Sequence, residues 1–130
     1  MKEQDGVLSV LDSVVGACKR IHLPPVRLES QVVDAIRKEF RRADLSFEEE
    51  VTVAPRCRVD FVVEGAVAVE VKKGKPNSRV VSGQIERYAA APMVEGVVLV
   101  SERGLIDHLE EAHGKPVRYV ALAKNWGIAL

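Results

Sequence analysis

The 130-residue chain has few cysteines, few aromatic residues and no excess of charge of either sign. Its two cysteines, Cys18 and Cys57, stand far apart and lack the spacing of metal ligands. This argues against a disulfide framework or a zinc site and favours two free thiols in a reducing compartment. Lys plus Arg equals Asp plus Glu, so contact with nucleic acid would depend on a local basic patch.

Long apolar runs are also missing. No stretch approaches the roughly 18 residues of a membrane span. The first residues carry a Lys and acids before any apolar segment, unlike a secretory signal peptide. We therefore expect a cytoplasmic protein with no membrane contact. At this length, the composition predicts one domain with a hydrophobic core of its own.

The spacing of apolar residues predicts both helices and strands. Helical spacing predicts helices over 5–21, 28–40, 81–91 and 104–114, the last one with Gly114 as its stop. Alternating or continuous apolar patterns predict strands over 47–53, 58–63, 66–72, 94–101 and 116–123. This order predicts an α/β fold with a mixed central sheet and helices on both faces. We divide it into an N-terminal helix with a Pro-containing connection (1–26), a core (27–123) and a tail (124–130).

The stretch VDFVVEGAVAVEVKKGK at 59–75 predicts a valine-rich hairpin, and its two apolar strands contain three charged residues: Asp60, Glu70 and Lys72. Residues two apart on a strand point to the same face, so Glu70 and Lys72 are neighbours. A tight turn at Glu64-Gly65 would pair residues whose numbers sum to about 129. That register sets Asp60 opposite Val69 and beside Glu70.

The small residues Ala66 and Ala68 share the face of Glu70, and we expect them to leave space for a ligand at its carboxylate. Two carboxylates bind Mg²⁺, which keeps several waters. The metal lowers the pKa of a bound water and polarises a phosphoryl oxygen, and a nearby Lys orients or deprotonates that water. The set predicts phosphodiester hydrolysis with Mg²⁺ or Mn²⁺. The alternative is a solvated charged face, but unpaired charge in central strands is costly.

Asp60 followed by Glu70-Val71-Lys72 on consecutive strands resembles the PD-(D/E)XK nuclease superfamily, which includes restriction endonucleases, Holliday-junction resolvases and RecB-like exonucleases. The resemblance extends from about Glu29 to Ser101. It implies a restriction-endonuclease-like mixed sheet with an αβββαβ core. It also implies that Asp60, Glu70 and the Val71 carbonyl bind the metal and that Lys72 positions the attacking water.

In the same superfamily, a Glu on the helix before the hairpin acts through water or holds a second metal. Glu29 matches that position best, and Glu39 is the runner-up. Gln84 and Tyr88, four residues apart on the predicted helix after the hairpin, are similar to the RecB-like motif. The resemblance suggests that Gln84 orients the site and that Tyr88 packs against it or contacts the substrate. A half-buried core aromatic is the alternative for Tyr88.

Basic residues surround the motif. The candidates for binding nucleic-acid phosphates, together with Tyr88, are Lys73, Lys75, Arg79, Arg87 and Arg58. A solvated charged loop is the alternative. A second cluster, Arg37, Lys38, Arg41 and Arg42, is interpreted as a polar helix flank.

The expected partner is DNA, and the function predicted is that of a metal-dependent nuclease. A non-catalytic nucleic-acid-binding or assembly module on the same fold is the alternative. The sequence leaves open a homodimer and a partner protein that supplies substrate specificity.

Overall fold

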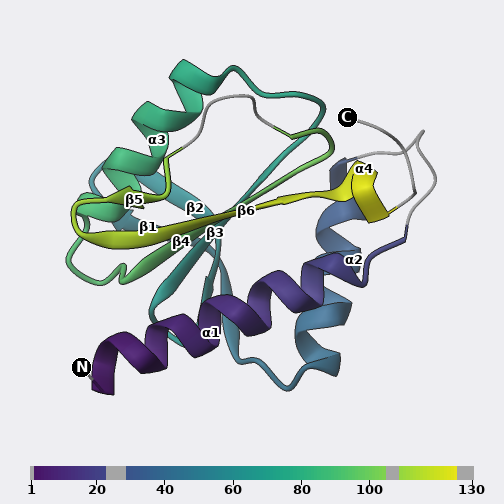
Figure 1. The fold of residues 1–130 in the computed structure, drawn as a ribbon, viewed down its shortest axis with the longest axis horizontal. Helices are drawn as coiled ribbons and strands as arrows, with labels where there is room; N and C mark the ends of the chain where they lie inside the picture. The colour runs from purple at the N-terminus through teal and green to yellow at the C-terminus, as the bar shows by residue number, and fades with distance from the viewer. Residues whose placement is uncertain (1, 23–28, 105–108, 126–130) are drawn as a thin grey trace.

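The computed structural model describes residues 2–22, 29–104 and 109–125. Four helices and six strands follow one another along them (Figure 1). The helices are α1 (Lys2–Lys19), α2 (Glu29–Arg42), α3 (Ser78–Ala90) and the short α4 (Leu122–Asn125). The strands are β1 (Phe47–Ala54), β2 (Cys57–Val63), β3 (Val67–Lys72), β4 (Gly96–Ser101), β5 (Glu111–Ala112) and β6 (Lys115–Ala121).

The strands form one mixed sheet in the order β1-β2-β3-β4-β6-β5. The first three strands make an antiparallel meander, and β4 and β6 then continue the sheet parallel to β3. The helix α3 makes the crossover between β3 and β4, as a parallel pair requires. The carboxyl ends of β3, β4 and β6 therefore meet at one edge of the sheet.

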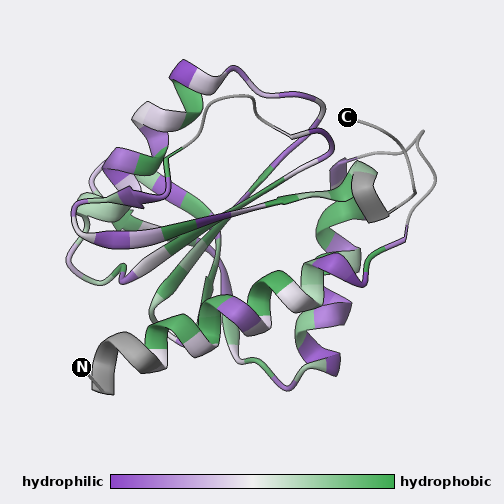
Figure 2. Ribbon diagram, viewed as in Figure 1, coloured by the Kyte–Doolittle hydropathy of each residue, from purple (hydrophilic) through white to green (hydrophobic). Residues whose placement is uncertain are grey.

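Helices cover both faces of the sheet, as the sequence predicts. On one face, α1 and α2 pack against alternate residues of the central strands, among them Phe61, Val69 and Val98. On the other face, α3 packs through Val81 and Ile85 against the residues in between. Figure 2 shows the hydrophobic residues concentrated along the central strands and on the helices that cover them. The alternation follows from the period of two along a strand.

Helix α3 starts earlier than the apolar spacing predicts. The side-chain oxygen of Asn77 accepts hydrogen bonds from the N–H groups of Arg79 at 3.0 Å and Val80 at 3.1 Å. These bonds satisfy N–H groups that have no partner within the helix, which is the usual role of an Asn at this position. The helix therefore begins at Ser78 and not at 81.

The register of the β2–β3 hairpin corrects the expected one. Phe61 pairs with Val69 and Val63 with Val67, so paired residue numbers sum to 130 and not to 129. Glu64 and Gly65 both have positive φ, as a type I′ turn requires, but Ala66 belongs to the turn and not to the strand. The extra turn residue shifts every pair by one, and such a shift exchanges the faces of all side chains on one strand relative to the other.

The helix expected over 104–114 is wrong where its residues are described, and its residues 105–108 lie outside that part. Glu111 and Ala112 form β5, which pairs with Pro116 and Lys115 at the start of β6. The turn between them has positive φ at His113 (51°) and Gly114 (72°). Gly114 thus closes a hairpin and does not stop a helix. The predicted strand 116–123 ends at Ala121, where α4 follows.

The two cysteines are both buried, and neither forms a disulfide. Cys18 belongs to the core on the α1–α2 face, whereas Cys57 belongs to the core under α3. The sheet separates them. None of the helices in the described ranges combines the length and the apolar character that crossing a membrane would require. Residues 126–130 of the predicted tail lie outside the described part.

Candidate functional site

Asp60 and Glu70 meet near the carboxyl end of β3. The register of the hairpin brings position 60 of β2 next to position 70 of β3, on the face that α3 covers. With the expected register, Asp60 would have shared a face with Val69 and pointed away from Glu70. The observed shift of one residue is what puts both carboxyl groups on one side of the sheet.

Two hydrogen bonds link the carboxylates across the hairpin. The Val71 N–H donates to Asp60 Oδ2 at 2.7 Å, and the Asp60 N–H donates to Glu70 Oε1 at 3.3 Å. Each carboxylate is thus held by a backbone donor of the neighbouring strand. These bonds replace a regular backbone pair at this point, because the paired residues end at Phe61 and Val69. The side chains are fixed by strands, which hold a site more precisely than loops do.

Glu70 has two further partners on its other oxygen. The Tyr88 hydroxyl donates to Glu70 Oε2 at 2.9 Å, and the Lys72 ammonium lies 3.3 Å from the same atom. Glu70 is 9% exposed and Tyr88 is 4% exposed. Tyr88 extends from α3 to the Glu70 carboxylate and covers it on the α3 side of the sheet. A buried carboxylate needs partners of this kind, because an unpaired one would lose its hydration without compensation.

Burial and proximity disfavour the fully ionised state of the carboxyl pair. Burial raises the pKa of Glu70, and the neighbouring Asp60 charge and a hydrogen bond to the Asp60 carboxyl raise this pKa further, against the smaller effects of Tyr88 and Lys72. Burial and the Glu70 charge also raise the pKa of Tyr88, which keeps its hydroxyl protonated as a donor. Two adjacent carboxyl groups resist double ionisation. A divalent cation between them would reverse that resistance.

Gln84 lies on α3 one helical turn before Tyr88. Its side-chain oxygen Oε1 is buried, and none of the residues that the structure describes donates a hydrogen bond to it. Residues four apart share a helix face, so Gln84 and Tyr88 point the same way. A buried acceptor without a donor is unusual in a folded protein and indicates a water or ligand that would complete it.

The space expected above Ala68 is filled. Ala68 is buried in the core under α3, with Val81 and Ile85, and Ala66 lies in the turn. Helix α3 therefore covers the strand face that carries Glu70, and this face is not open to a ligand at Ala68. Access to the carboxylates must come from the edge of the sheet, where β3 ends at Lys72.

These residues fit a hard divalent cation. The Asp60 and Glu70 carboxylates and the Val71 carbonyl are oxygen ligands of the type that Mg²⁺ and Mn²⁺ accept, and waters would complete the shell. The side-chain oxygen Oε1 of Gln84 could accept a hydrogen bond from such a water. Within the described residues there is no group of three or more His, Cys, Asp or Glu side chains that could hold a metal. The protein would thus supply two carboxylates and main-chain oxygen.

The structure separates the two candidate helix glutamates. The Glu39 carboxylate lies near the end of α2, bound to Arg20 Nε at 3.2 Å and close to Arg42 Nη1 at 3.4 Å. Glu29 is exposed in the first turn of α2. Phe40, near the opposite end of α2, stacks edge-on with Phe47 at the start of β1. Glu29 is about 16 Å along the helix from Phe40.

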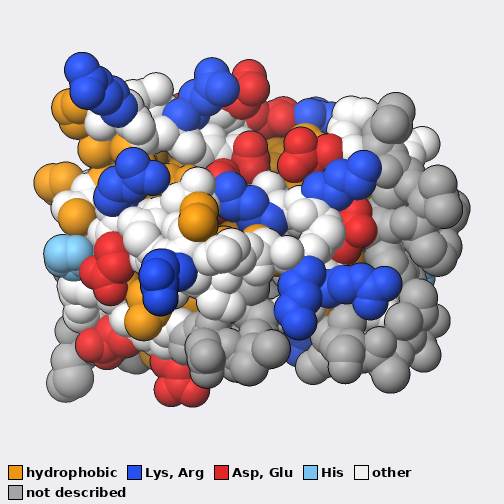
Figure 3. All heavy atoms as spheres, turned by 90° about the horizontal axis from the view of Figure 1, so that it is seen from above, with side chains coloured by type: hydrophobic (Ala, Val, Ile, Leu, Met, Phe, Trp, Pro, Cys, Tyr) orange, Lys and Arg blue, Asp and Glu red, His pale blue; other side chains and the backbone are white. Residues whose placement is uncertain are grey.

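The basic candidates are exposed, in contrast to buried Tyr88. They are Arg58, Lys73, Lys75, Arg79 and Arg87. The view from above in Figure 3 shows Lys and Arg side chains spread over this face with Asp and Glu side chains among them. In this view, the side chains of the described residues form no single uniform patch of positive charge. Tyr88, whose hydroxyl is bound to Glu70, offers little surface to a nucleic acid.

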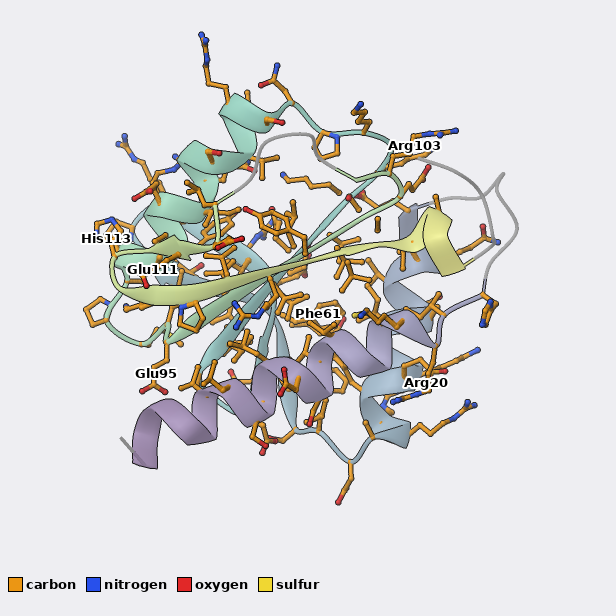
Figure 4. The ribbon with its side chains drawn as sticks, viewed as in Figure 1. Arg20, Phe61, Glu95, Arg103, Glu111 and His113 are labelled. Atoms are coloured by element: carbon orange, nitrogen blue, oxygen red, sulfur yellow. The ribbon has the colours of Figure 1, made fainter. Side chains whose placement is uncertain are left out.

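Arg103 belongs to the same edge and was missed in the sequence. Its N–H donates to the Gly74 carbonyl at 3.2 Å, which ties the end of β4 to the loop after Lys72. Figure 4 shows Arg103 and Glu95 at opposite ends of the sheet. The parallel pairing of Lys72 with Ser101 creates this proximity. Only the register of two strands separated by a helix would have revealed it.

Cys57 also lies near the site. The thiol is at the start of β2, and its pKa is raised, mainly by burial and also by the Glu70 charge, while the Arg87 charge lowers it. A raised pKa leaves the thiol protonated and unreactive at neutral pH. Cys57 therefore acts as a small apolar neighbour of the carboxylates.

No protein-family model matches this chain, and neither a curated protein nor a solved structure matches it.

Proposed function

We propose that the protein is a nuclease that uses Mg²⁺ or Mn²⁺ to hydrolyse phosphodiester bonds of DNA. The observation that carries this proposal is the convergence of Asp60, Glu70 and Lys72 at the end of one hairpin, with both carboxylates held by backbone donors of the adjacent strand. A solvated charged surface would not need a carboxylate that is 9% exposed and hydrogen-bonded to a buried tyrosine.

The arrangement of the elements supports the same proposal. The order α2, β1, β2, β3, α3, β4 is the αβββαβ order that the resemblance to the PD-(D/E)XK superfamily implies. In that resemblance the acids and the lysine occupy the second and third strands, as Asp60, Glu70 and Lys72 do here. The restriction-endonuclease-like fold is part of the proposal.

Each residue has a defined part in it. The Asp60 and Glu70 carboxylates and the Val71 carbonyl would hold the cation, which supplies an acidified water and a polarised phosphoryl oxygen. The Lys72 ammonium, half-buried beside Glu70, is placed to orient the attacking water and to offset negative charge that develops on the phosphate. Tyr88 holds Glu70 in place. The exposed basic residues would contact backbone phosphates at the rim.

Cleavage assays test the proposal directly. Linear, nicked and four-way-junction DNA are incubated with the protein in Mg²⁺, in Mn²⁺ and in a chelator. We expect cleavage with either metal, none with the chelator, and none for Asp60→Asn or Lys72→Ala. Arg41→Gln is the control, because Arg41 is exposed beside Phe47 at the far end of α2. Metal-dependent cleavage by both site variants at the wild-type rate would contradict the proposal.

One observation favours the alternative, a non-catalytic nucleic-acid-binding or assembly module. Asp60 and Glu70 already have hydrogen-bond partners, and no third acidic or His side chain completes a metal group among the described residues. Salt-sensitive DNA binding without cleavage of any substrate would support this second function. A partner protein would then supply any catalysis.

A further inference from the structure

A cavity lies away from the carboxylate pair, where the end of α1 meets α2. Its volume is about 490 Å³, and it is lined by side chains of α2 and of residues 20–22, which directly follow α1. That volume falls within the range of small-molecule sites, about 300–1,000 Å³. Helices α1 and α2 cover the face of the sheet opposite to α3. The carboxylate pair is on the α3 face, so the sheet lies between the two features.

The wall of this cavity is rich in cationic groups. Arg20, Lys38 and Arg42 line it together with His22. In Figure 4, Arg20 lies beside α2, on the α1 side of the molecule. Lys38 and Arg42 belong to the basic flank of α2 that sequence patterning assigns to solvent. The fold therefore brings them together with Arg20, which directly follows α1.

Two acidic residues on the wall already have partners. Glu39 is 9% exposed, and its two oxygens lie 3.2 Å from Arg20 Nε and 3.4 Å from Arg42 Nη1. Asp34 is paired with Arg37. One buried carboxylate thus holds two guanidinium groups, and each guanidinium has N–H donors beyond the one that contacts Glu39.

Lys38 is different from the two arginines. Within the part of the chain that the structure describes, its ammonium has no hydrogen-bond or ion-pair partner. The wall consequently has more cationic donors than acceptors. Oxyanions with several acceptor oxygens match guanidinium and ammonium donors that converge from different directions.

We propose that this cavity binds a small phosphate-bearing molecule. Arg20, Arg42 and Lys38 contact the phosphate, and Glu39 positions both guanidinium groups for it. The volume exceeds what a bare phosphate needs, and Ile21 and Ala35 on the wall offer apolar contact to an organic part. The carboxylates of Asp34 and Glu39 disfavour a continuous polyanion, so a single phosphate group fits better than a nucleic-acid backbone.

Titration calorimetry on the full chain tests this site independently of nuclease activity. The probes are inorganic phosphate, adenosine monophosphate and duplex DNA, each at constant ionic strength. We expect the first two to bind, with the monophosphate tighter. Lys38→Gln and Arg42→Gln should each weaken binding about ten- to a hundredfold, because each removes a charged hydrogen bond. Arg41→Gln, next to Arg42 but off the cavity wall, should bind as the wild type does.

The proposal is overturned if the wild type binds neither small probe at millimolar concentration. It is also overturned if Arg41→Gln and Arg42→Gln weaken binding equally, which would indicate nonspecific attraction by surface charge. A loss of DNA affinity in Lys38→Gln, with monophosphate binding unchanged, would assign the surface to nucleic acid and contradict it as well. All three positions are exposed on α2, and circular dichroism confirms the fold of each variant.

Discussion

The two faces of the β2–β3 hairpin have different roles, although the same two strands form both. On the α1–α2 face, Phe61 and Val69 lie in a core of apolar side chains. Phe61 stacks edge-on with Phe40 and Phe47 at centroid distances of 5.4 and 5.7 Å. The neighbouring residues on the α3 face are charged. They are Asp60, which precedes Phe61, and Glu70, which follows Val69.

The comparison shows how a hairpin can hold buried charge. The apolar face is strongly specified, because a slip of one residue would expose its side chains and bury polar ones. It therefore fixes the register that brings Asp60 and Glu70 together on the opposite face. The polar face itself contributes constraint rather than net stability, since a buried carboxyl pair is unfavourable without a cation. Variants on the two faces should separate stability from activity.

Glu70→Gln should have the largest effect, and only on activity. It keeps the shape of the side chain but removes the charge of a proposed metal ligand and reduces the interaction with Lys72. We expect cleavage to fall by about 10²–10⁴-fold, the range for losing an essential charged group at a reacting centre. The unfolding free energy should stay the same or rise. If the variant is much less stable but as active per folded molecule as the wild type, the two faces do not have the separate roles described above.

Phe61→Ala should have the largest effect on stability. Phe61 is fully buried, and its truncation removes three-way ring packing and leaves a cavity. We expect a loss of about 3–5 kcal/mol in the free energy of unfolding, measured by urea denaturation. Folded Phe61→Ala at low temperature should still bind Mn²⁺. A loss below about 1 kcal/mol would show that this face does not fix the register.

Tyr88→Phe should have a smaller effect, on both stability and activity. It removes the donor to Glu70 Oε2 but leaves the ring in the core under α3. We expect a loss of about 1.5–3 kcal/mol, as for a buried hydrogen bond to a charged group. The loss should shrink at acidic pH, where Glu70 becomes protonated. An equal loss at pH 5 and pH 8 would mean that Tyr88 acts only by packing.

The pH dependence of stability should report the carboxyl pair. The pKa of Glu70 is raised in the folded protein by burial and by Asp60. Between its ordinary value and this raised value, the folded state binds more protons than the unfolded state. In a chelator, stability is therefore full below the ordinary pKa and falls as pH rises through the raised one.

This fall should not exceed about 1.4 kcal/mol per pH unit for one proton. Saturating Mg²⁺ should reduce the slope, because the cation favours the ionised pair, and Glu70→Gln should reduce it without metal. Denaturation series across pH, with and without Mg²⁺, measure both effects. A slope that neither Mg²⁺ nor the substitution changes would place the titration elsewhere.

Sequence patterning predicts most of the fold and the residue types of the site. The period of two along 58–72 places Asp60 and Glu70 on strands, and helical spacing locates α1, α2 and α3 to within a few residues. The register could not be predicted, because Ala66 continues the apolar pattern of β3 while the backbone assigns it to the turn. Likewise, the apolar and charged spacing of 104–114 suits a helix, but positive φ at His113 and Gly114 forms a hairpin.

Contacts between elements that are far apart in the sequence could not be predicted either. The bond from Tyr88 to Glu70 depends on how α3 lies across the sheet, and the link between Arg103 and Gly74 depends on parallel pairing of β3 with β4. The ion pair of Glu39 with Arg20 likewise depends on how α2 packs beside the end of α1. None of these contacts has a local signature in the chain.

The most direct test of the central claim is a crystal structure with Mn²⁺ and an anomalous difference map. We predict one strong peak between the Asp60 and Glu70 carboxylates, with the Val71 carbonyl and waters around it. A peak elsewhere, or no peak at saturating Mn²⁺ while Asp60 and Glu70 keep their present hydrogen bonds, would contradict it.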